Sequence, residues 1–159
     1  MRAAMAQQLW LLRHGEAVPH DSGPDEQREL TERGRDQSRA AGRALKALEV
    51  TVHVCFTSPK ARARETAELA CAELGVDPID EEALADGFDG RAALELMRAA
   101  GPDQRVLVVG HEPDFSQVVY DLTGGRVDFK KGGIAGIRLD GSRGELIVLL
   151  RPRETDRIR

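Results

Sequence analysis

The sequence of 159 residues contains few cysteines and no long hydrophobic run. Its two cysteines, Cys55 and Cys71, are too few and too far apart to indicate a disulfide framework or a zinc site, and they are typical of buried thiols in a reducing compartment. Gln7 and Gln8 interrupt the apolar N-terminal stretch, so we expect neither a signal peptide nor a membrane-spanning segment. These absences favour a cytoplasmic protein that makes no membrane contact.

The chain also lacks an excess of positive charge. Lys and Arg total 23 and Asp and Glu total 27, which gives a net charge of −4. A mildly acidic protein does not produce the broad positive field that attracts nucleic acid, so nucleic acid is not an expected partner. Any anionic ligand must therefore be bound by a few placed side chains.

No repeat, low-complexity tract or interdomain linker divides the sequence. The length and a hydrophobic content of 41% are sufficient for one globular unit with a sizeable core. We therefore predict a single domain over residues 1–159, in which residues 1–6 form a loose tail and residues 151–159 a polar tail.

Apolar runs and helical spacings alternate along the chain. Continuous β-rich runs predict strands at residues 9–12, 52–57 and 106–109, a short edge strand near residue 79, and an antiparallel hairpin at residues 134–139 and 145–150. Apolar stripes predict helices after Thr31, between Ser58 and Gly75, at residues 91–100, and between Pro113 and Gly124. This alternation implies a mostly parallel sheet with helices on both faces. The predicted fold class is α/β: a three-layer α/β/α sandwich with a mostly parallel central sheet and a C-terminal antiparallel hairpin.

Polar side chains follow three of the predicted strands. Arg13 and His14 follow the first strand, Ser58 and Arg62 follow the second, and His111 follows the third. The carboxyl ends of parallel strands meet at one edge of a sheet, where ligands bind. Two arginines at that edge favour a phosphate ligand, because the planar guanidinium group matches phosphate oxygens. A histidine beside them can act as a nucleophile in phosphoryl transfer.

Three motifs occur in order, each after a predicted strand: LRHGE at residues 12–16, SPKARARETA at residues 58–67, and GHEP at residues 110–113. Together they resemble the motifs of the histidine phosphatase superfamily, whose members include the cofactor-dependent phosphoglycerate mutases. The resemblance implies a phosphoglycerate mutase-like fold. It also implies that His14 is the nucleophile that becomes phosphorylated, that Arg13 and Arg62 clamp the phosphate, and that His111 is an additional phosphate contact. The pocket neighbours that it implies are Ser58 and Gly15.

The resemblance narrows to the SixA-type phosphohistidine phosphatases. The chain has no long insertion between Ile79 and Val106, where the larger mutases carry elements that enclose the substrate, and VDFKKGGIAGIRLDG at residues 127–141 is similar to the corresponding SixA segment. The similarity extends over residues 9–150. It implies an open site and, as partner, a phosphohistidine-bearing protein of a signalling or phosphotransfer type. A broad phosphomonoesterase acting on small phosphate esters and a non-catalytic module that docks on phosphoproteins remain alternatives, and a mutase is the least favoured.

The residue types predict a mechanism that needs no metal ion or cofactor. A neutral His14, with one ring nitrogen held by a hydrogen bond, attacks phosphorus through the other, and water hydrolyses the phosphohistidine intermediate. Nearby positive charges favour the neutral imidazole. Arg13, Arg62 and, when protonated, His111 supply the charge that stabilises the transferring group.

Two further assignments are less direct. The resemblance to the mutase-like members implies that a carboxylate after the second helix is the general acid that protonates the leaving group. Glu81, Glu82 and Asp86 lie near that position, and Glu82 is our candidate for this role. Lys130 and Lys131 could contact an acidic partner protein, although a lysine pair before a strand is more typical of a solvated sheet edge.

Overall fold

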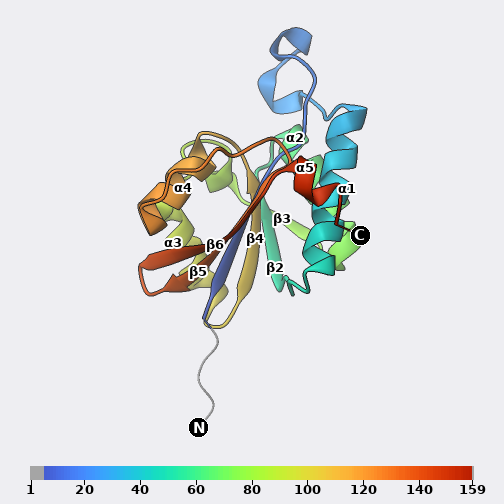
Figure 1. Cartoon of the computed structure of the whole chain (residues 1–159). Helices are drawn as coiled ribbons and strands as arrows, with labels where there is room; N and C mark the ends of the chain where they lie inside the picture. The colour runs from blue at the N-terminus through green and yellow to red at the C-terminus, as the bar shows by residue number, and fades with distance from the viewer. Residues whose placement is uncertain (1–5, 159) are drawn as a thin grey trace.

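A six-stranded mixed sheet forms the centre of the structure, a computed structural model that describes residues 6–158 (Figure 1). The strand order is β3-β2-β4-β1-β5-β6. The strands are β1 (Gln8–Arg13), β2 (Val54–Thr57), β3 (Pro78–Asp80), β4 (Arg105–Gly110), β5 (Ile134–Asp140) and β6 (Arg143–Leu150). Strands β1 to β4 pair in parallel, whereas β5 pairs antiparallel with β1 and with β6. The predicted mostly parallel sheet with a C-terminal antiparallel hairpin is confirmed.

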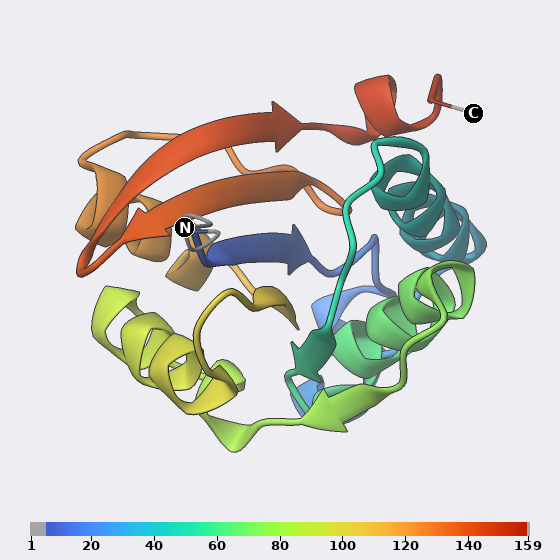
Figure 2. The ribbon, with the colours of Figure 1, turned by 90° about the horizontal axis from the view of Figure 1, so that it is seen from below.

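Helices cover both faces of this sheet (Figure 2). Leu9 and Leu11 of β1 pack in one buried cluster with residues of the third and fourth helices, and Trp10 and Leu12 pack on the other face with residues of the first and second. This alternation follows from the two-residue period of a strand. The helices are α1 (Glu32–Ala47), α2 (Ala61–Leu74), α3 (Gly90–Ala100), α4 (Asp114–Thr123) and α5 (Pro152–Thr155), and the short 3-10 helices are η1 (His20–Ser22), η2 (Asp25–Gln27) and η3 (Glu82–Leu84).

The helix ends follow the predicted signals. The Thr31 hydroxyl accepts a hydrogen bond from the Gly34 N–H at 3.1 Å and so caps α1. Gly75 has a φ of 73° and ends α2 in the left-handed conformation that glycine adopts without strain. Cys55 and Cys71 are buried free thiols, as expected.

The C-terminal segment, expected to be a polar tail, contains a short helix. Residues 152–155 form α5, which packs beside the start of α1 (Figure 1), and Thr155 is buried. Pro152 suits the first turn of a helix, and the Glu154 carboxylate accepts a hydrogen bond from the Arg151 N–H at 3.1 Å. The polar tail expected at residues 151–159 therefore includes a packed helical turn. The expected N-terminal tail lies, apart from Ala6, outside the described residues.

Over residues 6–158, no helix is long and apolar enough to cross a membrane.

Candidate active site

The carboxyl ends of β1, β2 and β4 meet as predicted. The His14 N–H donates to the Gly110 carbonyl at 3.0 Å, and the Ser58 N–H donates to the Val109 carbonyl at 2.9 Å. These bonds extend the sheet beyond its strand ends and bring three distant segments to one edge. A pocket of about 170 Å³ lies there, lined by Arg13, His14, Ala17, His20, Arg28, Arg62, His111, Glu112 and Lys131.

His14 is buried and held in one tautomer. Its Nδ1 lies 2.7 Å from the Gly15 carbonyl oxygen. Because a carbonyl can only accept, Nδ1 must carry the hydrogen, and Nε2 keeps its lone pair. Burial, together with the charges of Arg62 and Arg13, lowers the pKa of His14 from 6.5 to about 3 despite the opposing effect of the Gly15 bond. His14 is therefore neutral at physiological pH.

His111 faces His14 across the pocket, with ring centroids 5.3 Å apart. Its Nε2 lies 2.8 Å from the Ser58 hydroxyl oxygen, which also accepts a hydrogen bond from the Lys60 N–H at 3.2 Å. Burial and the charges of Arg62 and Lys60 lower the pKa of His111 to about 4. His111 is therefore neutral at physiological pH, because the cations that keep His14 neutral act on His111 as well, and the charge at the pocket comes from the arginines.

Arg13 is fixed by the loop that precedes β5. Its Nη1 donates to the Phe129 carbonyl at 2.7 Å. Its Nε is buried and has no hydrogen-bond partner among residues 6–158. Arg13 also lines the pocket beside His14. This geometry holds the guanidinium group at the pocket while leaving hydrogen-bonding capacity for an anion.

Arg62 is held by a carboxylate that the sequence analysis did not single out. Its Nη1 donates to the Asp25 carbonyl oxygen at 2.8 Å, and its Nη2 donates to Asp25 Oδ2 at 3.2 Å. Although burial opposes ionisation of Asp25, the hydrogen bond from Arg28 and the charge of Arg62 lower its pKa to about 2. Asp25 is therefore ionised and orients the second guanidinium group of the pocket.

A buried polar network supports the loop that carries His14. The Gly15 N–H donates to the Thr66 hydroxyl at 3.1 Å, and that hydroxyl donates to the Arg62 carbonyl at 2.8 Å. Ser38 of α1 lies 3.2 Å from the same hydroxyl. The loop after β1 is thus tied to both α1 and α2.

Three arginines, a lysine and the neutral imidazoles of His14 and His111 line this small pocket, a set of side chains that suits a tetrahedral oxyanion. Residues 9–91, which include the first two motifs, match the sequence model of the histidine phosphatase superfamily (branch 1). The chain belongs to this superfamily. The third motif, GHEP, lies beyond the matched residues, and the tertiary structure brings His111 of that motif to the other two.

The proteins similar to this histidine phosphatase include one of uncharacterised function and two named phosphatases. A protein of uncharacterised function from Picosynechococcus sp. is 34% identical over 160 residues, covering 92% of this chain and 97% of the relative. The structure of the protein histidine phosphatase SixA complexed with tungstate is similar with a TM-score of 0.84 at 28% identity, covering 92% of this chain and 98% of that chain. The alpha-ribazole phosphatase from Shigella flexneri has the same fold, with a TM-score of 0.70 at 20% identity over 91% and 96% of the two chains. The similarity to SixA confirms the subgroup indicated by the sequence.

Glu82 does not reach the pocket of this histidine phosphatase. Its side chain is exposed on η3 and is not among the lining residues, because the buried Leu84 anchors η3 and turns Glu82 to solvent. The assignment of Glu82 as general acid is therefore not supported. Glu112 is the one carboxylate that lines the pocket within residues 6–158, and both of its oxygens accept hydrogen bonds from Ser116, at 2.7 and 2.5 Å.

The sequence analysis missed Arg28 and Asp25 and assigned Lys131 to a solvated edge. Arg28 and Lys131 line the pocket, and the Nε of Arg28 donates to Asp25 Oδ1 at 3.0 Å. Arg28 and Asp25 lie in the irregular segment between β1 and α1, where no periodicity signals which side chains turn inward. The place of Glu112 at the pocket could have been predicted from the sequence, since Glu112 directly follows His111 in the third motif.

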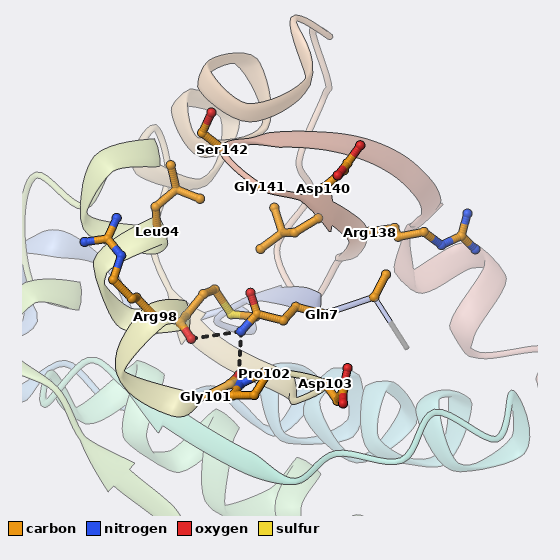
Figure 3. Close-up of a pocket in the computed structure, with 13 residues that line it drawn as sticks. Gln7, Leu94, Arg98, Gly101, Pro102, Asp103, Arg138, Asp140, Gly141 and Ser142 are labelled. Carbon is orange, nitrogen blue, oxygen red and sulfur yellow. Dashed lines mark hydrogen bonds between the residues drawn. The ribbon is translucent and has the colours of Figure 1, made fainter. Parts of the chain in front are cut away.

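A larger cleft, of about 920 Å³, lies near the amino ends of β1 and β4, away from this chemistry (Figure 3). Gln7 lies in it and donates to the carbonyl oxygens of Met97 and Gly101 at 3.0 and 2.5 Å. Among residues 6–158, two arginines and two aspartates but no histidine line it: Arg98, Arg138, Asp103 and Asp140. This balanced charge does not suit a phosphate site.

Proposed function

We propose that the protein is a metal-independent phosphatase that acts through a phosphohistidine intermediate on His14 and that its substrate is phosphohistidine in a protein. The observation that carries the proposal is the hydrogen bond from His14 Nδ1 to the Gly15 carbonyl oxygen at 2.7 Å. It leaves Nε2 unprotonated in a pocket that Arg13 and Arg62 also line.

In the first step, His14 Nε2 attacks phosphorus and the phosphorus–nitrogen bond to the substrate histidine breaks. The leaving imidazole retains the electron pair of that bond and takes up a proton. Phosphorylated His14 still carries hydrogen on Nδ1, so it is a cationic phosphoimidazole and a good leaving group. In the second step, water attacks phosphorus, inorganic phosphate is released, and neutral His14 is restored.

The pocket charges support this reaction. Arg13 and Arg62 stabilise the equatorial oxygens of the transferring group. His111, neutral in this structure, contributes through an N–H donor rather than a full charge, and Ser58 orients its ring. Gly15 contributes the carbonyl oxygen that fixes His14.

The size of the pocket supports a substrate that remains mostly outside it. At about 170 Å³ it is smaller than the roughly 300–1,000 Å³ that is typical of sites for whole small molecules. It suits a phosphoryl group and the ring that bears it, with the rest of a protein substrate at the surface. The similarity to a SixA structure complexed with tungstate, a tetrahedral oxyanion, agrees with this use.

The leaving group also favours phosphohistidine. An alkoxide needs a general acid as it departs, whereas the nitrogen of a phosphoramidate can be protonated before the bond breaks. Within residues 6–158 the pocket is lined by one carboxylate, Glu112, and both of its oxygens already accept hydrogen bonds. We therefore expect unactivated alkyl phosphates to be poor substrates.

The test is phosphate release, with excess chelator, from a phosphohistidine-bearing protein and from a panel of small phosphate esters. The expected result is preferential release from phosphohistidine, complete loss of activity in His14→Ala, and an acid-labile phosphoenzyme in rapid-quench samples. Preference for a small ester would retain the nucleophile but replace the substrate class. Phosphate binding without turnover would indicate the docking module instead.

A further inference from the structure

A basic groove lies beside the candidate active site and shares two residues with it, Arg13 and Lys131. The groove has a volume of about 500 Å³. Within the described residues 6–158, its lining contains six cations and one carboxylate, together with Gln37 and Pro152: the charged residues are Arg13, Arg33, Lys130, Lys131, Arg151, Arg153 and Glu16.

Three segments far apart in the sequence build this groove. Arg33 lies in the first turn of α1, Lys130 and Lys131 precede β5, and Arg151 and Arg153 flank the start of α5. The packing of α5 beside α1 brings the first and last of these segments together (Figure 1).

The lysine segment is joined directly to the strand end that carries the nucleophile. The Gly132 N–H donates to the carbonyl oxygens of Arg13 and His14, at 3.1 and 3.0 Å. Gly132 has a φ of +75°, and a Cβ there would lie 3.0 Å from the Cβ of Gln37 in the groove wall. These contacts therefore hold the wall of the groove at a fixed position relative to His14.

The groove keeps an excess of positive charge after its own ion pairs are counted. Arg33 pairs with Glu16 at 3.9 Å, and Lys130 pairs with Asp128 at 2.9 Å. Glu154 pairs with both Arg151 and Arg153, at 2.9 and 3.5 Å. These pairs are exposed to solvent, and such pairs contribute only about 0–1 kcal/mol, so an incoming anion can compete with them.

Lys131 is exposed and makes no ion pair with any residue between 6 and 158. It lies between the two pockets, so positive charge is continuous from the catalytic pocket into the groove. A chain with a net charge of −4 thus concentrates cations where a substrate must approach.

We propose that this groove binds an acidic segment of the protein substrate, next to the phosphohistidine that enters the catalytic pocket. The inference rests on the proposed function and adds the chemistry by which the substrate is selected. Apart from Arg13, the cations are exposed and spread over three segments, which suits several carboxylates on a peptide rather than the converging buried donors of a second phosphate site.

The first test uses two synthetic peptides that carry one phosphohistidine, with either four glutamates or four glutamines on each side of it. We expect kcat/KM of the wild type to be about tenfold higher for the glutamate peptide, which corresponds to the combined effect of a few exposed charge pairs. Arg33→Glu/Arg153→Glu should abolish this preference. Phosphoramidate, which is too small to reach the groove, should be hydrolysed at the wild-type rate.

Arg43→Glu/Arg157→Glu is the matched control. Arg43 also lies on α1 and Arg157 in the C-terminal segment, both are exposed, and neither lines the groove. The two double variants change the net charge by the same amount. If the control variant retains the preference for the glutamate peptide, the loss of that preference in Arg33→Glu/Arg153→Glu is caused by the groove and not by the net charge. Loss of the preference in both double variants would overturn the proposal.

A binding measurement separates the groove from the proposed reaction. The fluorescence anisotropy of labelled octaglutamate should show binding to the wild type that is lost in Arg33→Glu/Arg153→Glu, even if neither phosphohistidine peptide is hydrolysed. Equal binding to both proteins overturns the groove assignment. Tighter groove-dependent binding of pyrophosphate or single-stranded DNA would overturn the assignment to an acidic protein segment.

Discussion

His14 combines the two properties that a nucleophilic imidazole needs, and both come from its immediate neighbours. The Gly15 carbonyl oxygen fixes the hydrogen on Nδ1, and burial with the charges of Arg62 and Arg13 lowers the pKa to about 3. Either property alone would be insufficient, because a neutral ring in the wrong tautomer would present a hydrogen to phosphorus. The role of His14 is therefore set by contacts within a few ångströms of its ring.

We expect nitrogen NMR of labelled histidine to show His14 neutral and protonated on Nδ1 from about pH 8 down to about pH 5, since its pKa of about 3 lies below the ordinary value of 6.5. In the unfolded chain His14 is protonated as the pH falls below about 6.5, whereas in the folded protein it stays neutral down to about pH 3. The contribution of His14 to the free energy of unfolding is therefore fully present above about pH 6.5 and is lost as the pH falls toward 3. A His14→Asn variant should show a smaller loss of unfolding free energy on acidification. Titration of His14 near pH 6.5 would contradict this account.

Arg62→Gln should lower kcat/KM about 10²-fold, the usual effect of removing one donor to a developing oxyanion. Arg64→Gln is the comparison, because Arg64 lies on the same helix but pairs with Glu68 and Asp80 outside the pocket. We expect that variant to retain wild-type kinetics. Similar losses in both variants would indicate damage to α2 rather than a role for Arg62 in phosphate binding.

Close packing between α1 and the loop after β1 places His14, the proposed nucleophile. A Cβ on Gly15 would lie 2.5 Å from the Gly34 carbonyl oxygen, and a Cβ on Gly34 would collide with the carbonyl oxygen of Glu16. Two backbones can approach this closely only because both positions are glycine. The first turn of α1 therefore acts as the support of the His14 loop.

Gly34→Ala should push the loop away from α1, lower the free energy of unfolding by about 1–3 kcal/mol, and reduce kcat. Gly42→Ala is the control, because its Cβ would lie 2.6 Å from the Ala70 carbonyl oxygen, at the contact of α1 with α2. We expect a comparable loss of stability there with kcat retained. Urea unfolding and steady-state kinetics measure both effects. Unchanged kcat in folded Gly34→Ala would refute the supporting role.

Charge is distributed unevenly over the surface of this α/β/α sandwich. Two apolar clusters, one on each face of the sheet, stabilise the fold, and the catalytic pocket lies at the edge where three parallel strands end. The basic groove adjoins that edge although the whole chain carries a net charge of −4. The acidic substrate that we propose would therefore be attracted to this side of the molecule.

This asymmetry predicts a dependence on ionic strength. Between about 0.05 M and about 0.5 M salt, kcat/KM for an acidic phosphohistidine protein should fall several-fold, because exposed charges separated by more than a Debye length are screened. Hydrolysis of phosphoramidate should change less, since its contacts lie inside the pocket. An equal salt dependence for the two substrates would argue against attraction by the groove.

Much of the site could be predicted from the sequence because parallel strands place their carboxyl ends together. Once residues 9–12, 52–57 and 106–109 are identified as strands, Arg13, His14, Ser58 and His111 must lie near one edge. The same topology determines the layers, since alternating residues of β1 face opposite helices. Short-range periodicity is sufficient for these conclusions.

Only the tertiary structure decided which irregular segments close around that edge. Asp25, Arg28 and Lys131 lie outside regular helices and strands or in a short turn. Arg62 holds Asp25, which in turn bonds Arg28, and the segment of Lys131 is bonded to the end of β1. Glu82 lies outside the pocket because the burial of Leu84, not the spacing of carboxylates, determines which way η3 turns. Similarly, α5 is too short to be stable alone and exists through its packing on α1. Local patterns encode the strands and helices, whereas contacts between distant segments decide protonation, loop placement and the basic groove.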